Sequence, residues 1–560
     1  MKSPFSFLRP SGGEPREPER SPPDPLEIVR AYHAATSHHF HRFARGPGEL
    51  DWATQPDPFR RYAGAELVAL DHVAADDGVA YDDVLGDGNV APRALDRAAL
   101  SALLLDAFGI TAWKQYGSST WALRANPSSG NLHPTEAHVL APPIAGVCDA
   151  PFLAHYAPRE HALELRARLS PAAWGALAGG LPRDAMFVAL TSIAWREAWK
   201  YGERAYRYVQ HDVGHALGAL AVSAGALGWR VELCDALGRE DLAALLGLAD
   251  ARGAEPEEPD VLVALVPRAA GDAELALPTS IDAALLPRTF VGLPNALSSS
   301  HVEWGAIDAA LEACRKPRTP PAREPGLAPR PLGFVPRPRA LGLREIVRQR
   351  RSAVDFDGRT ELALDDFARL LAQTTRGPAL ALPWAPRVHL ALFVHRVRGL
   401  EPGLYLAPRA STETPLLRAA FEKPFEWARV DLGAHGPELW RLATGDQRAT
   451  ARALSCHQDI AADSAFSLAM LARFEPTLRE VGGWAYPRLY WECGLVGQLL
   501  YLEAEAAGVR ATGIGCFFDE PVHAALGLSS LRWRSLYHFT VGGPVEDARL
   551  TTWPAYPPRA

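Results

Sequence analysis

Cysteine is scarce in this sequence, and the residues present are widely separated. The six are Cys148, Cys234, Cys314, Cys456, Cys493 and Cys516. No C-x-x-C motif occurs and no Cys/His pair stands at zinc-site spacing, so neither a disulfide framework nor a structural metal site is expected. This usage is typical of a reducing cytosol, and we expect a cytoplasmic protein with no bound metal.

Long hydrophobic runs are also missing. Residues 1–25 are rich in Pro, Gly, Ser and charge and lack the apolar core of a signal peptide, which predicts a disordered tail. The stretch Val213–Trp229 carries His215 and Ser223 and is shorter than the ~20 apolar residues that a bilayer requires. It therefore predicts a helix buried in a large protein, and no membrane is expected as a partner.

The sequence has no excess of basic residues. It contains 58 Lys and Arg against 65 Asp and Glu, a formal net charge of −7. A generally basic surface for nucleic acid is therefore not expected. Neither G-x-G-x-x-G nor a Walker A loop occurs, which argues against a Rossmann NAD(P) domain. The hydrophobic content of 48% excludes wholesale disorder.

The length of 560 residues predicts more than one domain. Residues 315–339, RKPRTPPAREPGLAPRPLGFVPRPR, hold too much proline for a helix or central strand, and their arginines repel one another. We therefore expect a linker at 315–339 between a first domain at 26–314 and a second at 340–560.

The two parts resemble each other. AYRYVQHDVGHALGALAVSAGALGWR in the first and AYPRLYWECGLVGQLLYLEAEAAGVR in the second share their layout. Gly214 and Gly494 are separated by 280 residues, and so are Gly228 and Gly508. A repeat of this length indicates a duplicated domain rather than a solenoid.

Further upstream, matching helix signals continue the duplication. Asp96 and Asp365 each precede apolar residues at helical spacing and a terminal glycine, which predicts an Asp N-cap in both halves. Strand-like runs at 138–143, 387–395 and 537–543 alternate with the helices. Each half is therefore expected to have an α+β or α/β fold.

Two polar motifs carry unusual chemistry. In Asn126–Pro134, NPSSGNLHP, hydroxyls, amides and a glycine lie between prolines, which suits a loop that grips a planar polar ligand; an ordinary turn is the alternative. In Arg350-Arg351-Ser352, two adjacent guanidinium groups and a hydroxyl are suited to bind a phosphate through charge-assisted hydrogen bonds. The alternative is that these residues simply form part of a solvated surface.

Together with Trp199–Tyr208 and the glycine turn Gly513–Asp519, these motifs resemble the nitroreductase-like flavin oxidoreductases, most closely the SagB-type thiazoline/oxazoline dehydrogenases. The resemblance implies an α+β fold in which two fused nitroreductase-like domains form an intramolecular pseudo-dimer. It also implies FMN bound at the interface. A monomer is possible because both halves lie in one chain.

The resemblance assigns roles by position. Arg350, Arg351 and Ser352 would hold the FMN phosphate, and Gly515 and Cys516 would offer a backbone N–H to flavin N5. The residues expected to meet the ring and ribityl from the other half are Pro127, Ser128, Ser129 and Asn131.

Two further roles rest on the same resemblance. Lys200 and Tyr201 match the Lys-Tyr pair that moves the substrate proton in azoline oxidases. Val354 stands where the family often has a basic residue, and Arg549 is expected to compensate.

The repeat predicts that only one flavin site survives. Arg350–Ser352 align with Tyr81-Asp82-Asp83, whose carboxylates would repel a phosphate. Pro127–Asn131 align with Pro378–Leu382, which keep the proline and lose the polar side chains. The Lys-Tyr pair aligns with Glu480-Val481, and Gly513–Gly515 with Leu233–Asp235. One FMN per chain is therefore expected.

Other candidate sites fit less well. Ser37–His41 contains three histidines but no carboxylate or Cys at ligand spacing, so a polar turn is favoured over a metal site. Cys456-His457 and Cys493 suggest a Cys–His nucleophile, but nothing in the sequence orients the histidine.

The expected function is that of an FMN-dependent oxidoreductase that dehydrogenates a peptide azoline or a similar natural-product substrate, with hydride transfer to flavin N5. Partners would then be a small-molecule or peptide substrate and natural-product biosynthesis proteins. An NAD(P)H-dependent nitro- or quinone-reductase, with the nicotinamide bound transiently over the flavin, is the alternative. A flavin-free scaffold that recruits a partner enzyme is the second alternative.

Overall fold

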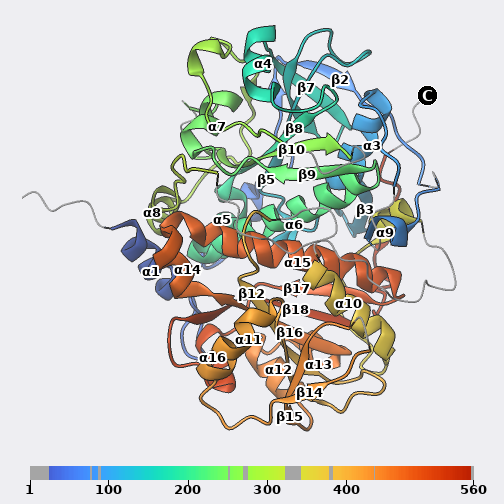
Figure 1. The fold of residues 1–560 in the computed structure, drawn as a ribbon, viewed down its shortest axis with the longest axis vertical. Coiled ribbons are helices and arrows are strands. Elements are labelled where there is room, and N and C mark those ends of the chain that lie inside the picture. The colour runs from blue at the N-terminus through green and yellow to red at the C-terminus, as the bar shows by residue number, and fades with distance from the viewer. Residues whose placement is uncertain are drawn as a thin grey trace, which may run out of the picture.

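The computed structural model describes residues 24–75, 78–85, 90–249, 253–268, 275–321, 342–376, 382–433 and 436–556. Two antiparallel seven-stranded sheets lie at opposite ends of the molecule, with helices between them (Figure 1). The expected α+β fold of two fused domains is confirmed.

The strands of each half follow the same spatial order. In the first sheet this order is β2 (Glu66–Ala69), β7 (Ala162–Arg168), β6 (Phe152–Ala157), β5 (Thr135–Ala141), β8 (Met186–Ser192), β10 (Glu258–Pro267) and β9 (Trp229–Leu233). In the second it is β14 (Ala428–Val430), β15 (Leu439–Thr444), β13 (Gly403–Ala407), β12 (Val388–Val394), β16 (Phe466–Arg473), β18 (Trp533–Gly542) and β17 (Arg510–Ile514).

Two central helices join the halves. They are α6 (Ala205–Gly225) and α15 (Tyr486–Ala506), and every residue of α6 is buried, as the apolar stretch predicts. A Cβ on Gly494 would lie 2.1 Å from the carbonyl oxygen of His211 and 2.8 Å from the Cα of Gly214. Because these glycines are equivalent in the repeat, a pseudo-twofold axis passes between them.

Of the two predicted Asp N-caps, the one at Asp96 is confirmed and the one at Asp365 is not. Helix α3 (Arg97–Phe108) begins after Asp96, whose carboxylate accepts a hydrogen bond from the Ala99 N–H at 2.7 Å. Helix α10 (Leu364–Arg376) already begins at Leu364, so the predicted cap at Asp365 is wrong. Asp365 lies in the first turn, where its charge favours the helix N-terminus instead.

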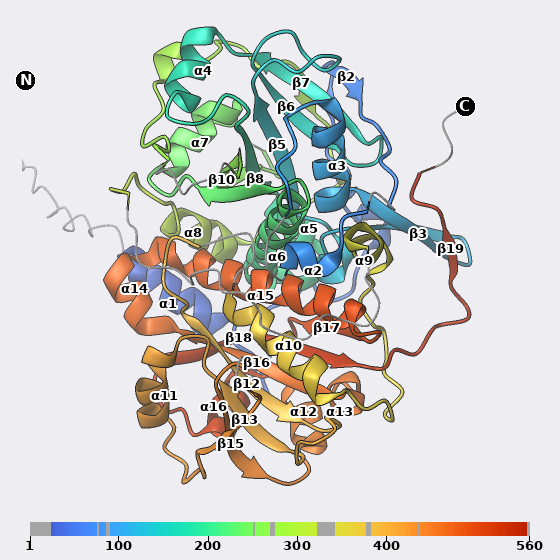
Figure 2. The same ribbon diagram turned by 45° about the vertical axis from the view of Figure 1, so that its right-hand side comes forward.

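Both ends of the described chain cross to the other half. After α1 (Pro25–Ala35), the His38 N–H donates to Asp519 at 2.8 Å. At the other end, β19 (Thr551–Trp553) pairs with β3 (Ile110–Tyr116), which forms a hairpin with β4 (Ser119–Arg124) at the side of the molecule (Figure 2). Each half therefore sends a terminal segment onto the other half.

The predicted tail and linker fall largely on residues 1–23 and 322–341, which lie outside the described residues. The start of the predicted linker is described, and it packs on the first half. Lys316 donates to the carbonyl of Leu237 at 3.1 Å, and Arg318 pairs with Asp241 at 2.7 Å. Within the described residues, no helix is both long enough and apolar enough to cross a membrane.

Candidate active site

A cavity of about 270 Å³ lies between the two halves. The first half contributes Pro127, Ser128 and Asn131 to its wall, and the second contributes Arg350–Ser352. Both motifs were predicted from the sequence to bind a ligand. They are more than 200 residues apart, and they line the same cavity.

The cavity wall is strongly cationic. Its basic side chains are Lys114, Arg124, Arg350, Arg351 and Arg510, and its acidic ones are Glu546 and Asp547. Burial lowers the pKa of Arg124 to about 10, and burial together with the charge of Arg350 lowers the pKa of Arg351 to about 10. A bound anion would relieve this crowding of positive charge.

Arg350 is the most enclosed of these cations that the second half supplies. It is only 4% exposed, its Nη2 donates to the carbonyl of Arg124 at 3.0 Å, and its guanidinium lies 5.0 Å from the ring centroid of Tyr501. Its Nε has no hydrogen-bond partner among the residues that the structure describes. A buried guanidinium with a spare donor is suited to a phosphate or carboxylate.

Tyr501 on α15 connects the phosphate-side motif to the glycine turn. Its hydroxyl lies 2.9 Å from Ser352 Oγ and accepts a hydrogen bond from the Gly513 N–H at 3.0 Å. Ser352 also forms a parallel bridge with Ala511 at the edge of β17. The backbone positions of Arg350–Ser352 and Gly513–Gly515 are therefore coupled.

The glycine turn leaves no room for side chains. A Cβ on Gly513 would lie 1.9 Å from the Tyr537 hydroxyl, and one on Gly515 would lie 2.4 Å from the ring of Tyr208. Arg204 fixes the turn by donating to the carbonyl of Gly515 at 3.1 Å. Neither Gly515 nor Cys516 is among the described residues that line the cavity.

The NPSSGN loop is held by its own side chains. Ser128 Oγ accepts from the His133 N–H at 2.8 Å, and the Asn131 amide donates to the carbonyl of Ala122 at 2.8 Å. Asn131 has a φ of 60°, a left-handed conformation that Asn tolerates better than most residues. Ser129 is not among the described residues that line the cavity, and both its backbone N–H and its hydroxyl donate to Asp212, at 3.1 and 3.3 Å.

Lys200 and Tyr201 lie against this loop at the end of α5 (Ala194–Tyr201). A Cβ on Gly130 would lie 2.5 Å from the Tyr201 hydroxyl and 3.1 Å from Lys200 Nζ. The rings of Tyr201 and Tyr208 are 4.7 Å apart. Burial raises the pKa of Tyr201 well above its usual value. The loop, the Lys-Tyr pair and the tyrosine that covers Gly515 therefore form one continuous cluster.

Two buried carboxyl groups behind the loop, Asp212 and Glu197, were not predicted from the sequence. Burial raises the pKa of Asp212 to about 7, although hydrogen bonds from Ser128 and Ser129 oppose this shift. Burial, and then the charge of Asp212, raises the pKa of Glu197 well above its usual range. Helical spacing is a signal for Glu197, which precedes Lys200 by three residues, and Asp212 is the one acidic residue of the fully buried helix α6.

Arg549 and Val354 lie at the rim. The Arg549 side chain is 72% exposed and pairs with Asp547 at 2.8 Å, while Asp547 and Leu550 line the cavity. Val354 lines the cavity and is 67% exposed. The compensating role of Arg549 stays a prediction.

At the pseudo-symmetric counterpart of the glycine turn, large or charged side chains replace the glycine and the tyrosine that covers it. The guanidinium of Arg488, the repeat equivalent of Tyr208, lies 4.4 Å from the Trp484 ring and 4.8 Å from the Trp384 ring. It also pairs with Asp235, the repeat equivalent of Gly515. Arg488, which stacks on two tryptophans, thus stands in place of the covering tyrosine, and its partner Asp235 stands in place of Gly515.

The remaining counterparts also have structural partners. Tyr81 on α2 (Tyr81–Leu85) is buried, and its hydroxyl donates to Glu503 at 2.9 Å. Glu480, which aligns with Lys200, pairs with Arg473 at 2.8 Å. Of the predicted apolar loop 378–382, residues 378–381 lie outside the described part of the chain.

Comparison with known proteins identifies the family. The model of the nitroreductase family matches residues 91–264 and 347–543. The chain belongs to the nitroreductase family. Since two separate regions match, the domain occurs twice in tandem, and the family supports an oxidoreductase in general terms.

One solved structure, with a TM-score above 0.5, shows the same fold, and others are similar to parts of the chain. One described as a nitroreductase from Anabaena variabilis is 23% identical, with a TM-score of 0.65, and the match covers 92% of this chain and 99% of that one. One from Ralstonia eutropha is 16% identical, with a TM-score of 0.28 and coverage of 40% and 98%. The E. coli microcin synthetase McbBCD complex contains a chain that is 16% identical, with a TM-score of 0.25 and coverage of 44% and 93%. No curated protein sequence matches this chain.

Proposed function

We propose that the chain is an FMN-dependent oxidoreductase with one composite FMN site. The observation that carries this proposal is the cavity between the halves, which combines the NPSSGN loop with Arg350–Ser352. The counterpart motifs are changed in sequence, and Asp235, the repeat equivalent of Gly515, pairs with Arg488.

The residues of the cavity fit the FMN phosphate. Arg350 offers an Nε without a partner among the described residues, and Arg351, Arg510 and Lys114 surround the same space. A phosphate dianion would form charge-assisted hydrogen bonds with this set and reduce the repulsion among its members. Ser352 adds a hydroxyl whose direction is set by Tyr501.

When bound, FMN would supply a two-electron acceptor at N5. The chain would orient it from both sides. Gly515 and Cys516 would offer a backbone N–H to the flavin. Arg204 holds this turn by donating a hydrogen bond to the carbonyl of Gly515. The loop residues Pro127, Ser128 and Asn131 would approach from the first half, and Ser129 would hold the loop through its two hydrogen bonds to Asp212.

Lys200 and Tyr201 would exchange the substrate proton. They end helix α5 beside Gly130, which lacks a side chain that could separate them from the loop. General acid–base catalysis requires such a group within hydrogen-bond reach of the reacting proton. The resemblance to SagB-type dehydrogenases supports a peptide azoline, or a comparable C–N or C–C bond in a natural product, as the substrate.

Anaerobic mixing of the FMN-loaded chain with a thiazoline- or oxazoline-containing peptide tests this function. We expect the visible flavin band to bleach and the peptide to lose two hydrogen atoms. In Lys200→Met we expect the same FMN content but slow bleaching.

The two alternatives give different results. An unbleached flavin that is instead rapidly reduced by NADPH and reoxidised by a nitroaromatic, equally in Lys200→Met, would identify a general reductase. A colourless chain that takes up no FMN would identify a scaffold.

A further inference from the structure

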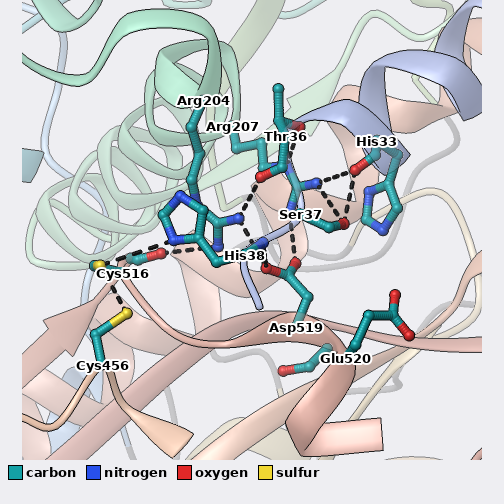
Figure 3. A network of polar contacts seen from close by, with 12 residues as sticks. His33, Thr36, Ser37, His38, Arg204, Arg207, Cys456, Cys516, Asp519 and Glu520 are labelled. Carbon is teal, nitrogen blue, oxygen red and sulfur yellow. Dashed lines mark hydrogen bonds and ion pairs between the residues drawn. The ribbon is translucent and has the colours of Figure 1, made fainter. Parts of the chain in front are cut away.

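A second group of reactive side chains, shown in Figure 3, is separate from the residues that line the cavity. Cys456 follows helix α12 (Arg448–Leu454), and Cys516 belongs to the turn after β17. Their sulfur atoms are 2.8 Å apart, and His38 Nδ1 lies 3.9 Å from Cys516 Sγ. These three atoms come from segments far apart in the sequence.

The sulfur–sulfur distance favours a dithiol over a metal site. Two thiolates that share a tetrahedral zinc ion, at about 2.3 Å each, are roughly 3.8 Å apart. A disulfide bond is about 2.05 Å long. At 2.8 Å the two sulfurs are too close to share an ion, and a short movement would bring them to bonding distance.

The charges around the pair favour a thiolate and oppose a cation. Asp519 accepts from Arg204 at 2.9 Å and from Arg207 at 2.7 Å, so one buried carboxylate serves two buried guanidinium groups. Arg204 also donates to the carbonyl of Gly515, the residue before Cys516. A hydrogen bond from Cys456, with a smaller contribution from His38, lowers the pKa of Cys516 to about 5.

Cys456 lies in a turn with an unfavourable backbone conformation. Cys456 and His457 have φ values of 52° and 58°, a left-handed conformation that disfavours residues with side chains. Gln458 secures this turn by donating to the carbonyl of Cys516 at 3.1 Å. Both cysteines of the pair are partly exposed, whereas the other four are buried. Small reagents can therefore reach this pair in the native protein.

We propose that Cys456 and Cys516 form a reversible dithiol–disulfide pair that reduces small-molecule disulfides. The Cys516 thiolate attacks the disulfide R–S–S–R, forms a mixed disulfide and expels one RS⁻. The Cys456 thiol then loses its proton and attacks Cys516 Sγ, which expels the second RS⁻ and leaves the Cys456–Cys516 disulfide. Counted from the two thiols, the pair loses two electrons and two protons: one proton leaves when Cys516 ionises and the other leaves Cys456, and these protons convert the two RS⁻ into two RSH. No flavin takes part, so this activity is independent of the proposed function.

The pair belongs to one half only. The repeat equivalent of Cys516 is Ala236. The dithiol therefore stands only beside the half-site that retains the glycine turn.

Alkylation of the native full-length chain before and after treatment with oxidised glutathione tests the proposal. The reduced chain should take up two iodoacetamide groups, on Cys456 and Cys516. The oxidised chain should take up none, and its intact mass should be lower by two hydrogen atoms. Dithiothreitol should restore both sites.

Single substitutions distinguish the attacking thiolate of Cys516 from the resolving thiol of Cys456. Cys456→Ser should stop at a mixed disulfide on Cys516, because the resolving thiol is gone, and Cys148→Ser should behave like the wild type. Wild-type chain that keeps both thiols, or that stops at a stable glutathione adduct, would overturn the proposal. So would one tightly bound zinc ion per chain that blocks alkylation until a chelator is added. The wild-type masses decide the question even if a variant fails to fold.

Discussion

Gly214 and Gly494 meet at the centre of the molecule, where a Cβ on Gly494 would lie 2.8 Å from the Cα of Gly214. The two residues are separated by 280 positions and are equivalent in the repeat. Their contact places the pseudo-twofold axis between α6 and α15, and it makes the single chain the counterpart of a two-subunit interface.

Replacement of Gly494 by alanine should destabilise the whole chain. The added methyl group would meet the His211 carbonyl oxygen at 2.1 Å, a backbone atom that cannot move alone. Overpacking of this kind costs about 1–3 kcal/mol. Urea denaturation should show a lower midpoint for Gly494→Ala.

Gly175→Ala is the matched control for this change. A Cβ on Gly175, inside helix α4 (Pro171–Ala178), would contact nothing within 4 Å. Alanine should therefore leave the midpoint unchanged or raise it, because it suits a helix interior better than glycine. Equal destabilisation by both substitutions would contradict the close approach of α6 and α15.

Arg350→Gln should weaken FMN binding. A hydrogen bond to a charged group contributes about 1.5–3 kcal/mol, so the dissociation constant should rise roughly 10- to 100-fold. Flavin fluorescence titration of the apo-protein measures this constant. Arg452→Gln, which removes an exposed arginine paired with Asp459, should bind FMN as the wild type does. The phosphate site is misplaced if both variants bind FMN equally well.

Asp212→Asn should stabilise the chain at neutral and alkaline pH. An aspartate carboxyl in water has a pKa of 3.8, and burial raises the pKa of Asp212 to about 7 in the folded state. Between these values the folded state binds the extra proton, so the stability of the wild type falls as the pH rises from about 4 to 7. Each unit of pKa shift corresponds to about 1.4 kcal/mol, which limits the gain to a few kcal/mol.

Melting temperatures of both proteins across this pH range measure the effect. Asparagine keeps an oxygen for the Ser129 donors and never ionises. The difference between variant and wild type should be near zero at pH 4 and should grow towards pH 8. A difference independent of pH would show that the ionised carboxylate is well tolerated in its buried position.

Asp235→Asn should destabilise the chain without affecting FMN. The change leaves the Arg488 guanidinium, enclosed by Trp484 and Trp384, without its carboxylate. Loss of one partner from a buried ion pair costs roughly 3–5 kcal/mol, and slightly less is expected here because both side chains keep some exposure. Thermal unfolding and FMN content should be measured on the same sample. Loss of FMN together with stability would place a flavin at the second position.

Sequence patterns predicted the features that depend on local chemistry. Gly214 and Gly494 are detectable because close helix packing allows no side chain at either position. Arg350–Ser352 and the NPSSGN loop are detectable because each is a continuous motif.

Features assembled from distant segments were not predictable in this way. Lys114, Arg124 and Arg510 join the cavity from a hairpin and a strand, and nothing local distinguishes them from surface cations. The Arg488 stack requires contacts between residues about 100 positions apart. The sequence near Cys456 contains no group that would orient a nucleophile, and the structure provides Cys516 across the fold.

The FMN stoichiometry of the purified, FMN-saturated chain tests the central claim most directly. Flavin released by denaturation, divided by protein concentration from amino-acid analysis, should give one FMN per chain, and Arg350→Gln should reduce this value under dilute conditions. Two tightly bound FMN per chain would contradict the account, because the second position, where Asp235 and Arg488 replace Gly515 and Tyr208, would then also bind flavin.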